Sequence, residues 1–313
     1  MEPGTAGATG DGTDIGRALA ERITVHRVIQ DCANCPELVI VPPGRFVLGS
    51  ADDEAFRDAD EGPALVVTFT NAFAIGQTEV TRGQFAAFIS ATGYAAAGQC
   101  LSWTGTRLEL VVGRSWRDPG YAQTDGHPVA CVTWRDAAAF VTWLRKTTGK
   151  AYRLQSNAEW EYAARGGTQA AHAFAGGEDD ACRFGNVADV SAKQDVAQWR
   201  TAACDDATGL GTARVRSYAP NGYGIYDTVG NVWEWIADCY QPTYLGAPID
   251  GSAWGSAGEC GAAFDRGGGF SNLMPGHLRA ANRSRAPSPD TAAYSLGFRV
   301  ARDLAAGEFV QGQ

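Results

Sequence analysis

The chain has 313 residues and a formal net charge of −9 at pH 7, and 45% of its residues are hydrophobic. This composition supports a sizeable core, while the acidic balance without a basic stripe argues against nucleic-acid binding. No apolar run approaches the roughly 18–20 residues that a transmembrane helix needs. Glycine accounts for 39 residues, which favours a turn-rich fold over a helical bundle.

The N-terminal part is expected to begin with a flexible lead-in, residues 1–30, because its sequence is mostly small and polar. The stretch ELVIVPPGRFVLGS (37–50) predicts two short strands around a turn at Pro43-Gly44. An acidic loop (52–63) follows, and LVVTFTNAFAIGQTEVT (65–81) is typical of a strand.

Three predicted helices begin with a capping box, in which a hydroxyl and an acid or amide three residues later bind the first free backbone amides. The pairs are Thr81 with Gln84, Thr133 with Asp136, and Ser156 with Glu159. From residue 168 onward no helical period is visible, only glycine, acids, amides and short apolar pieces. No linker divides the core, so we expect one domain over residues 31–305 and a C-terminal tail at 306–313.

Eight cysteines are spread over most of the chain. An even number suggests disulfides and an oxidising compartment, although the sequence does not determine their connectivity. Our hypothesis pairs nearest neighbours: Cys32 with Cys35, Cys100 with Cys131, Cys182 with Cys204, and Cys239 with Cys260. The alternative is eight free, mostly buried thiols in a cytosolic protein.

The N-terminal sequence argues against export, because MEPGTAGATGDGTDIG lacks the basic segment followed by an apolar one that a signal peptide has. Either a leader has been trimmed or the expected compartment is wrong. The CxxC motif in DCANCPE (31–37) is followed by Pro36 and a strand rather than a helix, and no second close pair could complete a zinc site. We therefore expect a small structural disulfide there.

The clearest local signal is NGYGIYDTVGNVWEWIAD (221–238), which places acids and an amide among glycines and aromatics. Hard cations such as calcium take six to eight oxygen ligands, many of them backbone carbonyls of tight loops. A glycine turn followed by a strand with exposed acids would give the same pattern. The spacing alone leaves both interpretations open.

Seven pieces occur in an order that resembles the formylglycine-generating-enzyme (sulfatase-modifying factor) family. They are VPPGRFVLGS, QTEVTRGQFAAF, HPVACVTWRDAAAFVTWL, YRLQSNAEWEYAARGG, NGYGIYDTVGNVWEW, RGGGF and LGFRVAR. The resemblance covers roughly residues 36–302. It implies a single compact α+β domain with a C-type-lectin-like fold and little regular secondary structure.

The resemblance also implies two structural calcium sites. At the first, Asp227 and Glu234 would offer carboxylates, and Gly230 and Val232 would offer carbonyls. At the second, Asn186 and Val187 would combine with an acid of the CDDATG piece. That loop is about one residue longer than the family pattern, so Asp205 and Asp206 compete for the role, and Asp206 is our choice.

In family members that convert a substrate cysteine to formylglycine, two cysteines five residues apart follow the RGGS motif and bind copper as thiolates. Here Asn272 and His277 fall near those positions, and the last cysteine is Cys260. An amide and one imidazole cannot make a copper(I) thiolate site. Copper-dependent formylglycine formation is therefore not expected.

Other family members use mononuclear iron held partly by histidines of an additional helical domain. This chain has four histidines, far apart, and no such domain. Iron or copper at His277 is thus unsupported, although acids could converge on it in space. The resemblance leaves two further classes: exported, periplasmic maturation factors without the thiol pair, and non-catalytic binding proteins that use the same C-terminal segment.

The expected function is a maturation or modification factor, periplasmic or secreted, that acts on a peptide, a protein or a peptide-derived small molecule. Its candidate catalytic residues are His277, Asn272 and Trp233, and its candidate binding residues are Arg279, Arg285 and Ser271. Arginines can bind a carboxylate or sulfate in a bidentate manner, but Arg283 is more consistent with a scaffold role. The alternative is a non-catalytic binding module, either a retroelement variable protein or an immunity-type protein, that uses residues 269–285.

Overall fold

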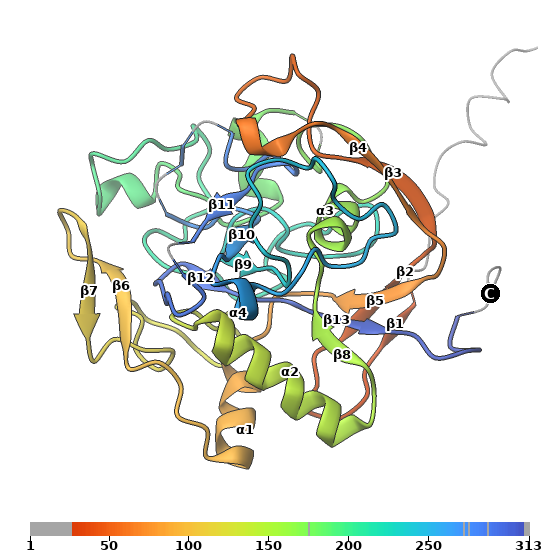
Figure 1. Ribbon diagram of the computed structural model, residues 1–313. Helices are drawn as coiled ribbons and strands as arrows, with labels where there is room; N and C mark the ends of the chain where they lie inside the picture. The colour runs from red at the N-terminus through yellow and green to blue at the C-terminus, as the bar shows by residue number, and fades with distance from the viewer. Residues whose placement is uncertain (1–26, 175, 272, 275, 287, 310–313) are drawn as a thin grey trace, which may run out of the picture.

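The computed structural model describes residues 27–174, 176–271, 273–274, 276–286 and 288–309. Its centre is an antiparallel five-stranded sheet in the order β1-β2-β5-β13-β8 (Figure 1). The strands are β1 (Val28–Ile29), β2 (Leu38–Val41), β5 (Phe73–Gly76), β13 (Val300–Asp303) and β8 (Tyr152–Leu154). Because β13 lies between β5 and β8, the C-terminal strand joins distant parts of the chain in one sheet.

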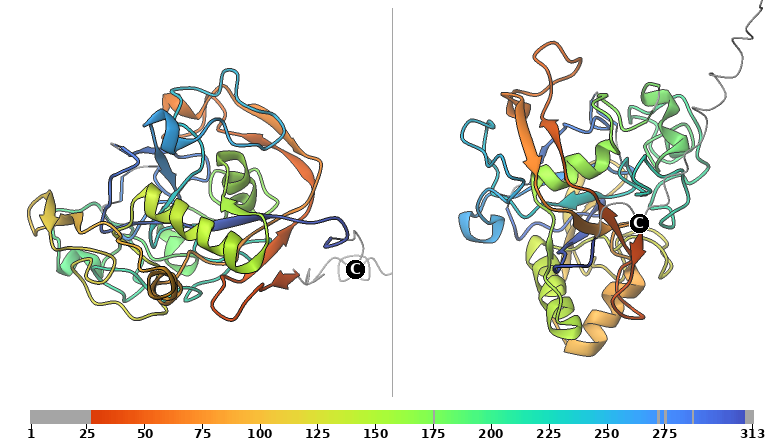
Figure 2. Two further views of the ribbon diagram at one scale, coloured as in Figure 1. Left: turned by 60° about the horizontal axis from the view of Figure 1, so that its bottom comes forward. Right: turned by 90° about the vertical axis from the view of Figure 1, so that its right-hand side faces the viewer.

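A second, four-stranded sheet has the order β11-β10-β9-β12, and two separate hairpins are formed by β3-β4 and β6-β7. The strands of the second sheet are β11 (Ser284–Arg285), β10 (Phe264–Arg266), β9 (Trp233–Trp235) and β12 (Leu296–Gly297). The hairpin strands are β3 (Gly44–Leu48), β4 (Leu65–Phe69), β6 (Gln99–Trp103) and β7 (Leu108–Val112). The β6-β7 hairpin projects at one side of the molecule (Figures 1 and 2).

The helices begin where the capping boxes predicted. They are α1 (Arg82–Thr92), α2 (Trp134–Thr148), α3 (Asn157–Arg165) and the short α4 (Ala257–Cys260), with 3₁₀ turns at Ala59–Glu61, Glu178–Arg183 and Ala192–Gln194. The N-cap hydroxyls of Thr81, Thr133 and Ser156 each accept a hydrogen bond from the third helical amide. The mixed, mostly irregular α+β architecture confirms the expected fold class.

The predicted single strand over residues 65–81 was wrong, because the chain forms two strands that enter different sheets. β4 pairs with β3, and β5 pairs with β2 and β13. The break falls at the bend around the exposed Asn71, between β4, in which buried and exposed residues alternate, and β5, which is buried throughout. The two strands at residues 37–50 are confirmed, but β2 and β3 do not pair with each other.

The main core lies between the central sheet and the helices α1 and α2. Phe85, Phe88, Phe140 and Phe298 are almost completely buried and make edge-on or stacked ring contacts. Each of these aromatics buries a large apolar area, which is the dominant favourable contribution to folding. Because Phe298 precedes β13, this core also anchors the C-terminal part of the domain.

All four predicted disulfides are present: Cys32–Cys35, Cys100–Cys131, Cys182–Cys204 and Cys239–Cys260. The nearest-neighbour pairing is therefore confirmed, and no free cysteine is found. Two of the bridges, 182–204 and 239–260, lie in the half of the chain that has little regular structure. Each closes a loop in the unfolded chain and so lowers its conformational entropy, which stabilises the fold.

Within the expected lead-in, Val28–Ile29 of β1 pairs with Leu38–Val39 of β2. Residues 1–26 of the expected lead-in lie outside the described residues. In the expected tail, Glu308 forms ion pairs with Lys150 and Arg302, which attaches residue 308 to the domain. Among the described residues, no helix combines the length and the apolar character that crossing a membrane requires.

Free-thiol titration of the denatured, unreduced protein is expected to find close to no thiols, because every cysteine is bonded. The same titration after reduction should find all eight. Protein made in an oxidising compartment that shows eight thiols without reduction would contradict the disulfide assignment.

Candidate functional site

The segment after β10 is positioned by a close approach of its glycines to buried indoles. Gly267 has a φ of 100°, and a Cβ atom there would lie 3.1 Å from the Trp160 ring, so a larger residue would be both strained and crowded. Phe270 is fully buried and donates its amide to the Asn231 carbonyl. The chain is thereby held against β9 as it enters the segment of interest.

Four side chains gather at this point, Trp233, Ser271, His277 and Ser295, which we call the Trp233 cluster. The rings of Trp233 and His277 meet edge to face with centroids 5.3 Å apart. The Ser271 hydroxyl donates to the Ser295 hydroxyl at 3.4 Å, and the Trp233 amide donates to the Ser295 carbonyl at 2.8 Å. The structure thus brings together three predicted site residues and one, Ser295, that was not predicted.

His277 is half-buried rather than an isolated surface histidine. Burial lowers the pKa of its imidazole below the ordinary value, and the nearby Glu178 carboxylate partly opposes this. Glu178 also accepts the amide of Gly276 at 3.0 Å and forms an ion pair with Arg200 at 2.6 Å. The lowered pKa favours a neutral imidazole at pH 7, which lies next to an indole and can accept a proton.

The arginines of the segment do not line this cluster. Arg279 is 3% exposed and forms ion pairs with Glu54 and Glu61, so the expectation that it binds a ligand is not supported. Arg285 is exposed but lies over the Tyr240 ring. Arg283 is buried among aromatic rings and donates to the Asp60 carbonyl, as a scaffold residue would. Asn272 lies outside the described residues.

Three buried carboxylates meet below this segment: Glu79, Asp227 and Glu234. Glu234 forms an ion pair with Arg299, and Glu79 accepts from the Val232 amide and the Asn231 side chain. One Asp227 oxygen accepts the Arg216 amide, whereas the other, Oδ1, is buried without a hydrogen-bond partner. An orphaned carboxylate oxygen of this kind calls for an explanation.

Burial is the main cause of the raised pKa values of two of these carboxyl groups. Burial raises the pKa of Asp227 to about 6. Burial, followed by the charge of Asp227 and opposed by Arg299, raises the pKa of Glu79 well above its ordinary value. Three buried carboxylates thus lie close to the Arg299 guanidinium, and one of their oxygens has no hydrogen-bond partner.

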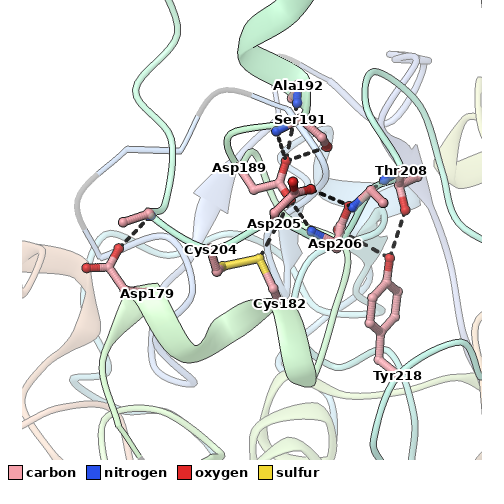
Figure 3. The surroundings of a disulfide bond; sticks show 12 residues. Asp179, Cys182, Asp189, Ser191, Ala192, Cys204, Asp205, Asp206, Thr208 and Tyr218 are labelled. Atoms are coloured by element: carbon pink, nitrogen blue, oxygen red, sulfur yellow. Dashed lines mark hydrogen bonds between the residues drawn. A yellow bond between two sulfur atoms is a disulfide. The ribbon is translucent and has the colours of Figure 1, made fainter.

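The second predicted cation site is less well formed. Figure 3 shows Asp206 beside the Cys182–Cys204 bridge, where its carboxylate accepts from Thr208 and Tyr218. Burial raises the pKa of Asp206 to about 6, whereas Asp205 is exposed, which favours Asp206 over its neighbour.

Asn186 belongs to a different hydrogen-bond network. Its side chain donates to the Gly211 carbonyl and to Asn231, although its own Oδ1 is buried without a partner. Val187 is buried in the hydrophobic cluster that also contains Phe270. The structure therefore gives Asp206 and the Asn186-Val187 pair no shared contact.

Within the part of the chain that the structure describes, no group of three or more His, Cys, Asp or Glu side chains is arranged around a common metal position. At the first cation site the three carboxylates point toward Asn231, Arg216 and Arg299. A cation there would depend on backbone carbonyls as well as acids.

The fold and the motifs agree with the sequence comparisons. Residues 25–304 match the model of the family described as "Sulfatase-modifying factor enzyme 1-like domain". The chain belongs to this family, whose members include proteins named formylglycine-generating enzyme.

Three relatives illustrate its range. The formylglycine-generating enzyme of Thermomonospora curvata is 34% identical over 302 residues, covering 85% of this chain and 93% of that protein. The solved structure of PvdO from Pseudomonas aeruginosa is 36% identical with a TM-score of 0.76, covering 89% of this chain and 98% of that one. A mouse protein named inactive C-alpha-formylglycine-generating enzyme 2 is 30% identical over 296 residues, covering 86% of each.

Sequence reasoning missed three contributors to these sites: Glu79, Glu178 and Ser295. Glu79 lies in the quoted piece QTEVTRGQFAAF, but nothing local marks it as a partner of residues 150 positions away. Glu178 and Ser295 likewise reach the site only through tertiary contacts. The one available signal was the position of Glu79 between a predicted strand and the capping box at Thr81, and this signal is weak.

Replacing Trp233 with alanine is expected to raise the pKa of His277 toward the ordinary value of about 6.5. The reason is that burial is the main cause of the depression, and the indole covers one edge of the imidazole. An NMR titration of the imidazole ring proton of His277 measures the change in pKa. The signal is assigned by its absence from the spectrum of His277→Gln. Trp254→Ala serves as the control, and an unchanged His277 pKa in Trp233→Ala would contradict the cluster.

Proposed function

We propose that this protein is a maturation or modification factor that acts on a peptide, a protein or a peptide-derived small molecule, without the copper-thiolate chemistry. One observation carries the proposal: the segment that resembles the family's active site holds no cysteine, and all eight cysteines are in disulfides. The Trp233 cluster occupies this segment instead. Its neutral imidazole could transfer a proton, and the two hydroxyls could orient a bound group.

Calcium is proposed as a structural ion at Glu79, Asp227 and Glu234. The orphaned Asp227 oxygen and the raised pKa of Glu79 support this assignment. When bound, calcium would neutralise carboxylates that otherwise repel one another. The ion would stabilise the loop that leads into β9, and so the position of Trp233. Residues Asn186, Val187 and Asp206 remain a weaker candidate for a second calcium site.

A periplasmic or secreted location is proposed as well. Four disulfides in one domain are typical of proteins that fold in an oxidising compartment. A non-catalytic binding module is the second candidate function, favoured by the 30% identity to a relative that is named inactive.

Calcium should stabilise wild type but not Asp227→Asn. At a calcium concentration one hundred times the Kd, the expected gain for wild type is about 2.7 kcal/mol, measured by urea unfolding. Without calcium the variant should be at least as stable as wild type, because it removes one of three mutually repelling buried charges. Asp250→Asn, which changes an exposed acid, is the control. Equal stabilisation of wild type and Asp227→Asn would contradict the assignment.

Deletion of the gene, followed by mass spectrometry of exported peptides and their derivatives, tests the proposed function. A peptide-derived species should accumulate in an unmodified form and return to its modified form on complementation with wild type. His277→Ala should fail to restore it, whereas His127→Ala, which lies outside the Trp233 cluster, should succeed. Full restoration by His277→Ala would argue against chemistry at this cluster and favour the binding module.

Elemental analysis of the disulfide-intact protein provides an independent check. Calcium is the expected metal. Stoichiometric iron or copper that is lost in His277→Ala would instead identify an oxidoreductase with a redesigned metal centre.

A further inference from the structure

The segment that carries His277, residues 273–277, is held at two points by one ion pair. Arg200 donates from its guanidinium to the Leu273 carbonyl at 3.2 Å, and the Arg200 carbonyl accepts the Leu273 amide at 3.1 Å. Glu178 accepts the Gly276 amide at 3.0 Å through one carboxylate oxygen, and its other oxygen contacts Arg200 at 2.6 Å. We call this pair the Glu178–Arg200 clamp, because it links both sides of the segment.

The clamp acts on His277 through the backbone beside it. Gly276 directly precedes His277, and the His277 amide donates to the Met274 carbonyl at 3.2 Å. Leu273 is buried in a hydrophobic cluster, so the start of the segment has a fixed base. A displacement of Gly276 would carry the imidazole away from the Trp233 ring, which it now meets edge to face. The position of His277 therefore depends on the contact between Gly276 and the clamp.

The two members of the clamp are distant in sequence, and the Cys182–Cys204 disulfide brings them together. Glu178 lies four residues before Cys182, in the same 3₁₀ turn, and Arg200 lies four residues before Cys204. Figure 3 shows Asp179 beside this bridge, where its carboxylate accepts the amide of the residue that precedes Cys204 at 2.7 Å. The bridge and this hydrogen bond together limit how far apart the two members of the clamp can lie.

The exposure of the clamp indicates a contribution to position rather than to stability. The Arg200 side chain is 43% exposed and the Glu178 side chain 16% exposed. An ion pair with a solvent-exposed member contributes little to folding stability, because water and salt screen it. The hydrogen bond from Gly276 to Glu178 is directional, in contrast, and it fixes the backbone next to the imidazole. Loss of the Glu178 carboxylate should therefore displace His277 without unfolding the domain.

We propose that Glu178 is a positioning residue of the Trp233 cluster: paired with Arg200 and held by the Cys182–Cys204 disulfide, it fixes the imidazole of His277 beside the indole of Trp233. Glu178 acts through the Gly276 backbone and not on the partner itself. A group that is already in place need not be ordered when a partner binds, which favours the reaction of that group. The inference rests on the proposed function, since it assigns the residue that prepares the same imidazole.

The clamp also places two opposite charges near the imidazole. Burial lowers the pKa of His277, the Glu178 carboxylate raises it, and the Arg200 guanidinium lowers it. Glu178→Gln keeps an oxygen that can accept the Gly276 amide but removes the negative charge, so the pKa of His277 should fall further. Loosening of the segment would raise this pKa instead, because a more exposed imidazole loses the effect of burial. The direction of the change therefore separates the two effects.

The first test compares Glu178→Ala and Glu178→Gln in the full, disulfide-intact chain. NMR measures the nuclear Overhauser effect between the ring protons of Trp233 and His277, which wild type should show because the ring centroids lie 5.3 Å apart. Glu178→Ala should lose most of this signal at a urea midpoint close to that of wild type. Glu178→Gln should keep the signal and lower the pKa of His277. Glu109→Ala, which removes an acid from an exposed ion pair with Arg107, is the control and should change neither.

The second test removes a disulfide and has a closely matched control. The Cys182–Cys204 and Cys239–Cys260 bridges have sequence separations of 22 and 21 residues, so losing either should raise the entropy of the unfolded chain to a similar extent. Each pair is replaced by alanines, and the Overhauser effect is measured where both variants remain folded. It should weaken in Cys182→Ala/Cys204→Ala and persist in Cys239→Ala/Cys260→Ala.

The outcomes separate the positioning role from the proposed function. An undiminished Overhauser effect in Glu178→Ala, or a His277 pKa that is unchanged or raised in Glu178→Gln, would overturn the inference. Equal weakening of the effect in the two disulfide variants would contradict the part assigned to the Cys182–Cys204 bridge. If Glu178→Ala loses the effect and yet both it and His277→Ala restore the modified species in the deletion strain, the positioning role stands and the proposed function fails.

Discussion

The buried ion pair between Arg299 and Glu234 joins the two main sheets and the loop before β9. Glu234 lies in β9 of the second sheet, and Arg299 precedes β13 of the central sheet and donates to the Gly76 carbonyl at the end of β5. Arg299 also donates to the Tyr226 and Asp227 carbonyls, and Glu234 accepts the Trp160 indole. Removing one partner of such a pair commonly costs ~3–5 kcal/mol, so the packing of both sheets and of the loop before β9 depends on it.

A second constraint is that half of the domain has little regular structure, so its buried polar groups need partners outside helices and sheets. Arg266 is completely buried. It donates to the Ala280 and Asn282 carbonyls and to the Asn157 side chain, and it forms an ion pair with Glu161. Buried guanidinium groups therefore supply hydrogen-bond donors to backbone carbonyls of the irregular segments, which lack the backbone ladders of a sheet. The disulfides at 182–204 and 239–260 add covalent restraint in the same half.

These constraints also hold the segment after β10. The three glycines of this turn pack closely against the side chains of Trp160, Leu278 and Trp233, which restricts the path of the chain that follows. Here that chain meets the indole of Trp233 and the hydroxyl of Ser295. Separately, Arg279 holds the loop between β3 and β4 through its ion pairs with Glu54 and Glu61.

The sequence by itself determined the features that rest on local chemistry. The capping boxes at Thr81, Thr133 and Ser156 predicted three helix starts, because each needs only residues one turn apart. The disulfides followed from nearest neighbours, since each loop they close is short enough for its ends to meet readily. The quoted motifs likewise indicated the family.

Only the tertiary structure decided what depends on residues distant in sequence. It turned Arg279 inward to Glu61, divided residues 65–81 between two sheets, and brought Glu79 to Asp227 and Ser295 to Ser271. Charge and burial of a side chain are properties of its surroundings, and those surroundings come from several segments at once. An arginine that could bind a ligand and one that clamps a loop have the same local sequence signal, and the carboxylates packed around them determine which role each takes.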